Sequence, residues 1–194
     1  MGTRHLVAVK LDDVYRVAQY GQWDGYPQGQ GRTVLAFLRK WNRAAFVESL
    51  RQCSFLTGEE IDGLNASMKR EGISDTWVKI YPELSRDTGA FVLGLIQSRP
   101  LKLKNNIGFA ADSLYCEWGY VIDLDANVLE VFKGFNKTPL VAGDRFFGAT
   151  GDYVAEGYHP IRKVASYPLD SALPTDEQLV NDCDPSDATG GDAE

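Results

Sequence analysis

Two pairs of segments with alternating hydrophobic and polar residues constrain the fold of this chain most strongly. The first pair, residues 5–11 and 14–20, flanks Asp12-Asp13, and the second, residues 120–124 and 128–132, flanks a short polar turn. Alternation with a period of two, interrupted by short turns, predicts β-hairpins with one buried face. The residues that we expect in the core are Val7, Val9, Val17, Tyr120, Ile122, Leu129 and Val131.

The segment between the hairpins has apolar residues at helical spacing and predicts three or four helices. Thr57 and Glu60 have the spacing of a capping box, which predicts a helix start, and Gly72 predicts the end of that helix. Residues 89–98 are apolar on nearly every side, as in a buried central helix. The other elements expected here are helices within 32–41 and 43–56 and a strand or extended linker over 75–81.

The order of these elements predicts an α+β fold, with a hairpin, a helical middle and a second, β-rich half. Further strands are expected within 145–153 and 160–169. A chain of 194 residues with 44% hydrophobic content can bury one sizeable core, so we expect a single globular domain over residues 1–169. Residues 170–194 are acidic and poor in apolar side chains, which predicts a disordered tail.

Charge and composition exclude several classes of function. The formal net charge of -7 argues against binding a nucleic acid polymer, which requires a basic face. The chain has no Lys or Arg after Asp170, so the body before the tail is nearly balanced in charge. Three cysteines and two histidines at wide spacings suggest neither a disulfide framework nor a metal site. With no long apolar run and no basic-then-apolar leader, we expect a cytoplasmic protein with no membrane segment and no cofactor.

A glycine-rich loop, residues 19–33 (QYGQWDGYPQGQGRT), joins the first hairpin to the helical middle. Each glycine raises the cost of ordering by about 0.5–1 kcal/mol relative to alanine in regular structure, so a plain connection would not need so many. The loop also contains aromatic side chains, hydrogen-bonding side chains and one arginine. This combination predicts that the loop forms one wall of the main pocket. The residues expected to bind a ligand there are Gln22, Trp23, Asp24, Tyr26 and Arg32. The alternative is a structural loop in which the two aromatic rings cover the core and Asp24 bonds to the loop backbone.

Glycines just before a helix can also cradle phosphate, but both known motifs of this kind fail in detail. The frame of a P-loop that ends in Gly-Arg-Thr begins at Tyr26 and has Arg32 in place of lysine. A dinucleotide fingerprint starting at Gly29 would need a third glycine at Val34. A nucleotide phosphate beside Arg32 is therefore one of the open alternatives for this loop.

The first residues, GTRHLVAVKLDD, place a threonine after a glycine at the head of a hairpin. This opening resembles that of N-terminal-nucleophile hydrolases such as proteasome β subunits. In that family a Gly-Thr bond is cleaved, and the freed threonine acts as the nucleophile with its own α-amino group as the base. The resemblance implies Thr3 as the nucleophile after loss of Met1 and Gly2, with Arg4 and His5 orienting substrate or transferring protons. It also implies an αββα sandwich, in which two sheets lie between helix layers.

A second resemblance covers most of residues 2–136. The motifs GTRHL, AQYGQWDGYPxGQG, SRDTGA, CEW, YVIDLD and LEVFKGFN are similar to those of a family of largely uncharacterised proteins from phages, bacteria and fungi. This resemblance implies a shared fold and a shared site, and it carries no established activity.

Three functional hypotheses follow from these patterns. The leading one is a hydrolase that acts on an amide or a related small-molecule bond at an N-terminal threonine. The second is a non-catalytic module that binds a small anionic or nucleotide-like ligand in the glycine-rich loop. The third is a phage-encoded protein that binds a host protein. A cysteine nucleophile at Cys116, beside Glu117, is a further alternative that would require a histidine partner.

Overall fold

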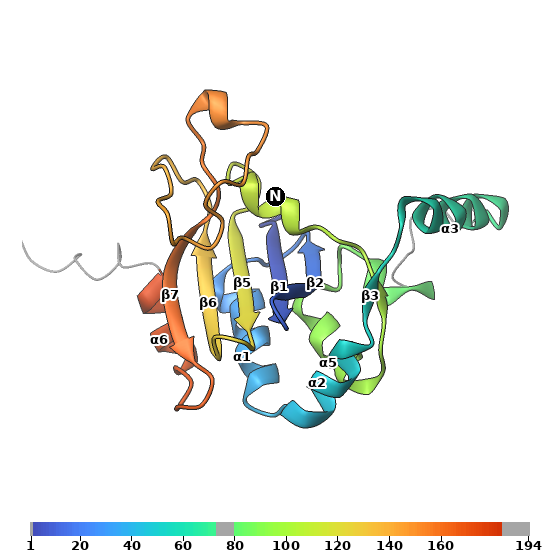
Figure 1. Ribbon diagram of the computed structural model, residues 1–194, viewed down its shortest axis with the longest axis horizontal. Helices are drawn as coiled ribbons and strands as arrows, with labels where there is room; N and C mark the ends of the chain where they lie inside the picture. The colour runs from blue at the N-terminus through green and yellow to red at the C-terminus, as the bar shows by residue number, and fades with distance from the viewer. Residues whose placement is uncertain (1, 73–79, 184–194) are drawn as a thin grey trace, which may run out of the picture.

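The computed structural model describes residues 2–72 and 80–183 and has an α+β fold built on one mixed sheet (Figure 1). The sheet has the strand order β2-β1-β5-β6-β7. Its first hairpin and its second hairpin are neighbours, because β1 pairs with β5 in parallel while the other pairs are antiparallel. The strands are β1 (His5–Leu11), β2 (Val14–Gly21), β5 (Trp118–Asp123), β6 (Val128–Lys133) and β7 (Arg162–Pro168).

Both predicted hairpins are confirmed. In the first, Leu11 pairs with Val14, and the two turn residues Asp12 and Asp13 have φ angles of 55° and 59°. Two consecutive positive φ values are the signature of a type I′ turn, whose twist matches that of the flanking strands. The second hairpin begins two residues earlier than predicted, at Trp118. Asp123 closes its turn by accepting hydrogen bonds from the backbone N–H groups of Asp125 and Ala126.

The helical middle is also confirmed. Thr57 and Glu60 form both halves of the predicted capping box, and Gly72 follows the helix with a φ of 65°. The predicted segment 75–81 falls largely outside the described residues. The helices are α1 (Arg32–Leu38), α2 (Arg43–Arg51), α3 (Gly58–Arg70), α5 (Val92–Ser98) and α6 (Asp176–Cys183), and the remaining strands are β3 (Ser54–Phe55) and β4 (Lys102–Leu103).

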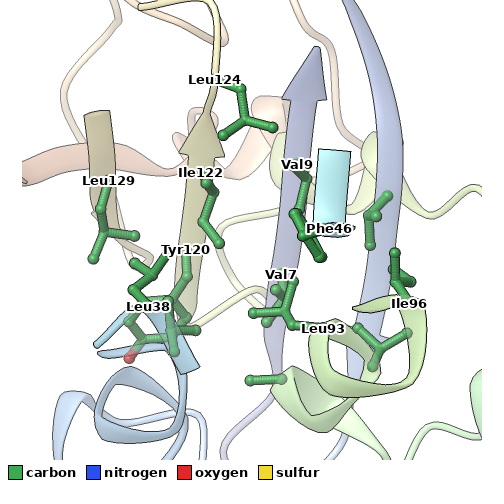
Figure 2. Close-up of a cluster of buried hydrophobic side chains, with 14 of the residues drawn as sticks. Val7, Val9, Leu38, Phe46, Leu93, Ile96, Tyr120, Ile122, Leu124 and Leu129 are labelled. Atoms are coloured by element: carbon green, nitrogen blue, oxygen red, sulfur yellow. The ribbon is translucent and has the colours of Figure 1, made fainter. Parts of the chain in front are cut away.

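The main core lies between one face of the sheet and helices α1, α2 and α5 (Figure 2). Val7 and Val9 of β1 and Tyr120 and Ile122 of β5 are fully buried there, together with Phe46 of α2. All seven predicted core residues belong to this cluster. Both hairpins therefore present their apolar face to the same helices.

A smaller core covers the other face of the sheet. Leu6, Ala8, Val121 and Phe132 point to this side and pack against Ile161 and neighbouring loop residues. The αββα sandwich is not confirmed, because the second sheet of the described residues is only the pair of two-residue strands β3 and β4. Loops and short helical turns cover this face instead.

The strand predicted within residues 145–153 is wrong, whereas the strand predicted within 160–169 is present as β7. Within this segment Gly148 has a φ angle of 81°, which is incompatible with an extended strand. The alternating side chains of this segment still have different environments, since Phe146 is buried and Phe147 is exposed. The alternation of buried and exposed side chains in this segment arises because one side of an irregular loop packs onto the smaller core.

The acidic segment after Asp170, predicted as disordered, contains α6. Leu179 and Cys183 of this helix are buried in the main core, and Arg39, the residue after α1, donates hydrogen bonds to the side chain of Asp176 and to the carbonyl of Pro174. Thr175 precedes α6 and accepts a hydrogen bond from the backbone N–H of Gln178, as an N-cap residue does. Residues 184–194 lie outside the described residues.

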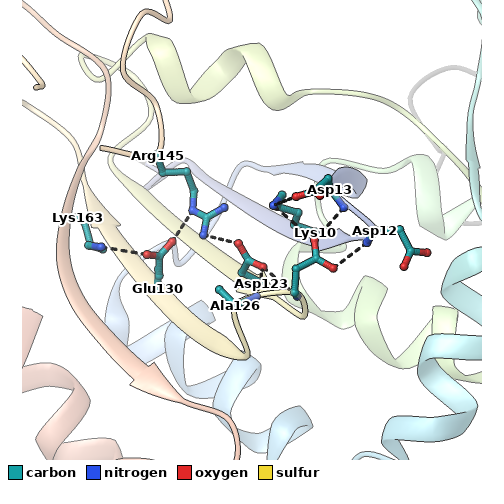
Figure 3. A network of polar contacts seen from close by, with 9 residues as sticks. Lys10, Asp12, Asp13, Asp123, Ala126, Glu130, Arg145 and Lys163 are labelled. Carbon is teal, nitrogen blue, oxygen red and sulfur yellow. Dashed lines mark hydrogen bonds and ion pairs between the residues drawn. The ribbon is translucent and has the colours of Figure 1, made fainter. Parts of the chain in front are cut away.

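An ion-pair network lies at the end of the sheet where β1 and β5 finish (Figure 3). Arg145 bridges Asp123, at 2.6 Å, and Glu130, and Lys163 pairs with Glu130 at 3.0 Å. The side chains of Asp123 and Glu130 are only 4% and 9% exposed, so Arg145 neutralises two buried carboxylates. Burial alone would lower the pKa of Arg145, but its hydrogen bonds to Tyr15, Asp123 and Glu130 raise it above its ordinary value.

Candidate functional site

Several of the segments singled out in the sequence meet at the opposite end of the sheet, where β1 begins. The N–H of Gly25 donates to the carbonyl of Thr3 at 3.0 Å, which holds the glycine-rich loop against the first residues. The N–H of Gln22 donates to the carbonyl of Arg86 at 2.9 Å, and the indole N–H of Trp23 donates to Asp87 at 2.8 Å. These bonds tie the segment 85–90 to the same loop.

The segments before β5 and after β6 complete this end of the sheet. Glu117 donates its N–H to the carbonyl of Arg4 at 3.1 Å, and its carboxylate accepts the N–H of Arg4 at 3.2 Å. The N–H of Phe135 donates to the carbonyl of Ser113 at 2.7 Å. The start of the chain is thus enclosed by residues that are far away in sequence.

A small pocket of about 150 Å³ opens at this junction, and we call it the N-terminal pocket. Its volume corresponds to roughly five water molecules, so it suits a short polar group rather than a large ligand. A larger cavity of about 400 Å³ lies beside α3 and contains none of the predicted site residues. The N-terminal pocket is lined by Gly2, Thr3, Arg4, Tyr26, Glu117 and Phe135.

Arg4 and Glu117 provide opposite charges in the wall of this pocket. The guanidinium of Arg4 lies over the ring of Tyr115, 4.4 Å from its centroid, and the Nε atom is 4.0 Å from the Glu117 carboxylate. Their side chains are 30% and 21% exposed, so both remain accessible to a ligand. The cation–π contact and the weaker ion pair both favour this orientation of the arginine side chain.

Three aromatic side chains around the pocket remain half exposed. Trp23, Tyr26 and Phe135 are 47%, 49% and 54% exposed, although each lies beside or in the pocket wall. Phe135 has a φ of 52°, a left-handed conformation that costs a bulky residue about 1–2 kcal/mol. A strained backbone that holds an aromatic ring at a pocket is typical of functional sites.

The glycines of the loop are required by close contacts. A Cβ atom on Gly21 would lie about 2.1 Å from the ring of His5, and one on Gly25 would lie 2.7 Å from the carbonyl oxygen of Thr3. A Cβ on Gly29 would lie 2.2 Å from the carbonyl oxygen of Asp24. The hydroxyl of Tyr120 also donates to the carbonyl of Gly25 at 2.8 Å. The loop is therefore packed directly on the start of β1 and holds Tyr26 at the pocket.

His5 does not line the N-terminal pocket. Its side chain is 1% exposed and lies over Gly21, and neither ring nitrogen has a hydrogen-bond partner of normal geometry among the described residues. Burial lowers the pKa of His5 to about 4, and the nearby backbone of Thr3 offsets a smaller part of this effect. The imidazole is consequently neutral at physiological pH.

The remaining predicted ligand-binding residues are distributed around the loop. Gln22 accepts a hydrogen bond from the hydroxyl of Tyr20 at 2.6 Å, and Asp24 is exposed with a φ of 55°. Arg32 lies at the start of α1, where its Nε atom is 3.7 Å from the carboxylate of Asp176. Arg32, the cation suggested as a phosphate ligand, is thus paired with an acidic side chain of the protein.

Cys116 is fully buried and its thiol lies 3.5 Å from the carbonyl of Trp118. Burial, and then the nearby carboxylates of Asp112 and Glu117, raise the pKa of this thiol well above its ordinary value. Because the thiolate is the reactive form, this environment is unlike that of a nucleophilic cysteine.

Besides Gly2, the pocket residues Glu117 and Phe135 were not among the predicted site residues. Both belong to motifs noted in the sequence, CEW and LEVFKGFN, but their proximity to Thr3 depends on the parallel pairing of β1 with β5. Of the predicted residues, Thr3, Arg4 and Tyr26 meet in the pocket, Trp23 lies against Gly2, and His5 and Arg32 lie outside it.

No family model matches this sequence, and no curated protein or solved structure matches it. Within the described parts of the chain, none of the helices is long and apolar enough to cross a membrane.

Proposed function

We propose that the protein binds a small molecule by inserting a short polar group, such as a carboxylate or an amide, into the N-terminal pocket. The observation that carries this proposal is the half-exposed ring of Phe135, held beside Arg4 and Glu117 by a backbone with positive φ. A guanidinium and a carboxylate offer paired hydrogen bonds to a polar terminus. Tyr26 and Phe135 would cover the attached apolar part.

The test is a thermal-shift and NMR screen with small carboxylic acids, primary amides and amino acids. Phe135→Gly is the most informative variant, because glycine tolerates positive φ and the folded state should be retained or become more stable by about 1 kcal/mol. We expect compounds that bind the wild type to lose at least tenfold in affinity with Phe135→Gly and with Tyr26→Ala. Phe91→Ala is the control, because Phe91 is 66% exposed and does not line the pocket. Equal affinity in all variants, or no binding by any compound, would contradict the proposal.

A second candidate function, amide hydrolysis by Thr3, uses the same pocket. It is supported by the position of Gly2 and Thr3 side by side in the pocket wall, where removal of Met1 and Gly2 would leave the Thr3 amine next to its own hydroxyl. Neutral His5 is outside the pocket, so the α-amino group would be the base in this mechanism.

Intact-mass measurement of the purified protein tests this candidate first, since the mechanism requires Thr3 at the terminus. A protein prepared to begin at Thr3 is then assayed against a panel of amide substrates. We expect cleavage that Thr3→Ser retains in part and Thr3→Ala abolishes. Retention of Gly2 in the mature protein, with no cleavage by the protein that begins at Thr3, would eliminate hydrolysis and leave the binding proposal intact.

A further inference from the structure

A second pocket, of about 380 Å³, is formed by two segments that the proposed function does not use, residues 105–112 and 150–152. It shares no lining residue with the N-terminal pocket. Its volume corresponds to about a dozen water molecules and lies in the range of small-molecule sites. We call it the amide–carboxylate pocket after its lining residues, Asn105, Asn106, Gly108, Phe109, Asp112, Thr150, Gly151 and Asp152.

Both walls of this pocket are fixed by backbone contacts. The N–H of Asn106 donates to the carbonyl of Ala18 at 3.0 Å, and the ring of Phe109 packs edge-on against Tyr20 with centroids 5.0 Å apart. On the other side, a Cβ atom on Gly151 would lie 2.4 Å from the carbonyl oxygen of Ala111, so the second segment rests directly on the first. This contact fixes Asp152 close to Asp112.

The polar groups of the pocket are dominated by acceptors and negative charge. The Oδ1 atom of Asp112 is buried and has no hydrogen-bond partner among the described residues. The net effect on Asp112 is a raised pKa: burial raises it most and the Asp152 carboxylate raises it further, whereas the backbone N–H groups of Tyr115 and Leu114 and the charge of Arg4 oppose this effect. Arg4 itself is engaged by Tyr115 and Glu117 in the wall of the other pocket. The two carboxylates therefore repel each other, and neither forms an ion pair with a cation of residues 2–72 and 80–183.

We propose that the amide–carboxylate pocket binds an organic cation, a protonated amine that also carries hydroxyl or amide groups. An ammonium group would neutralise Asp112 and Asp152, and further donors and acceptors of the ligand would match Asn105, Asn106 and Thr150. Phe109 offers an aromatic surface to the cation or to the adjacent methylenes. An anion is disfavoured by the carboxylates. A metal ion is the competing occupant, although the described residues contain no group of three or more His, Cys, Asp or Glu side chains that could hold one.

The probes are putrescine, spermidine, glucosamine and argininamide, each compared with a neutral analogue such as butanediol or glucose. We expect at least one cation to raise the melting temperature and to shift NMR resonances of residues 105–112, with affinity that falls as salt is added. The neutral analogues should have no effect. Calcium and magnesium chloride serve as separate probes, and a response to these ions alone would overturn the proposal in favour of a metal site.

Two variants place the binding event in this pocket. Asp152→Asn removes one charge from an exposed side chain, and Gly108→Leu fills the pocket from a position where an added Cβ meets no atom within 4 Å. Each should reduce cation affinity at least tenfold. Their controls are Asp62→Asn, which removes an equal charge on α3, and Gly94→Leu, which also meets no atom within 4 Å. The proposal fails if no cation binds or if both pocket variants bind as well as the controls. Because neither variant alters the N-terminal pocket, this result is independent of the proposed function.

Discussion

The carbonyl oxygen of Thr3 accepts a hydrogen bond from the N–H of Gly25, and the Cα of Gly25 lies so close that an added methyl group would be 2.7 Å from this oxygen. The start of β1 and the glycine-rich loop are therefore a single packed unit. Any side chain larger than hydrogen at position 25 would push the two segments apart.

Gly25→Ala should consequently destabilise the protein by about 1–3 kcal/mol, as expected for overpacking at a well-packed site. Gly63→Ala is the matched control, because Gly63 lies within α3 and an added Cβ meets no atom within 4 Å. Alanine favours a helix over glycine, so this control should gain about 0.5–1 kcal/mol. Urea denaturation measures both changes. Equal stability of the two variants would show that the loop can move away from Thr3.

The free energy of unfolding should depend on pH because the pKa of His5 differs between the folded protein and the unfolded chain. Its pKa is about 4 in the folded protein and about 6.5 in the unfolded chain, so the unfolded chain binds the proton first as the pH falls. The free energy of unfolding should decrease between pH 6.5 and pH 4, by up to about 3 kcal/mol from this residue, and the loss should end below pH 4.

The test for His5 is a comparison of denaturation curves between pH 3.5 and pH 7.5 for the wild type and His5→Phe, which keeps a ring of similar size. The difference between the two proteins should grow as the pH falls from 6.5 to 4 and then remain constant. Parallel pH profiles would mean that His5 gains a partner for its proton in the folded state.

Arg145→Met should cost about 3–5 kcal/mol, because it leaves the buried carboxylates of Asp123 and Glu130 without their shared cation. Arg51→Met is the control, since its ion pair with Asp12 joins side chains that are 53% and 52% exposed. Exposed pairs of this kind contribute at most about 1 kcal/mol. Thermal denaturation distinguishes the two, and a small effect at position 145 would indicate that Lys163 alone suffices for the network.

Leu179→Ala tests whether α6 belongs to the folded domain. The side chain of Leu179 is fully buried, and its removal should destabilise the protein by about 2–5 kcal/mol. Glu177→Ala changes an exposed residue of the same helix and should have an effect below 0.5 kcal/mol. If both variants match the wild type, α6 does not contribute to the stable core.

The sequence predicts elements whose signals are local. The hairpin turn at Asp12-Asp13, the capping box at Thr57 and the buried faces of the strands follow from neighbouring residues and are confirmed. The helix α6 could not be predicted from composition, because it is held by a few side-chain contacts with the body of the protein: the ion pair of Asp176, the hydrogen bond that Asp182 accepts from Tyr167, and the burial of Leu179 and Cys183. These contacts compensate for the low apolar content of the acidic segment.

The candidate site depends on contacts that local patterns do not contain. Thr3, Arg4 and Tyr26 were predicted as site residues from motifs in the sequence. Glu117 lies beside them because β5 pairs with β1 in parallel. His5 alternates correctly with its neighbours, but the space left by Gly21 directs its ring away from the pocket. A sequence pattern identifies which residues share a face of a strand and does not reveal which residue of another strand lies opposite.

The pairing of β1 with β5 also affects how the chain folds. Its partners His5 and Trp118 are 113 positions apart, and a contact of such long sequence separation forms slowly because a large loop must close first. During synthesis the first hairpin therefore emerges from the ribosome with one edge of β1 uncovered, and that edge stays open until β5 has been made. At about 5–20 residues per second, this exposure lasts roughly 6 to 23 seconds, a period in which a chaperone or another strand could bind the edge.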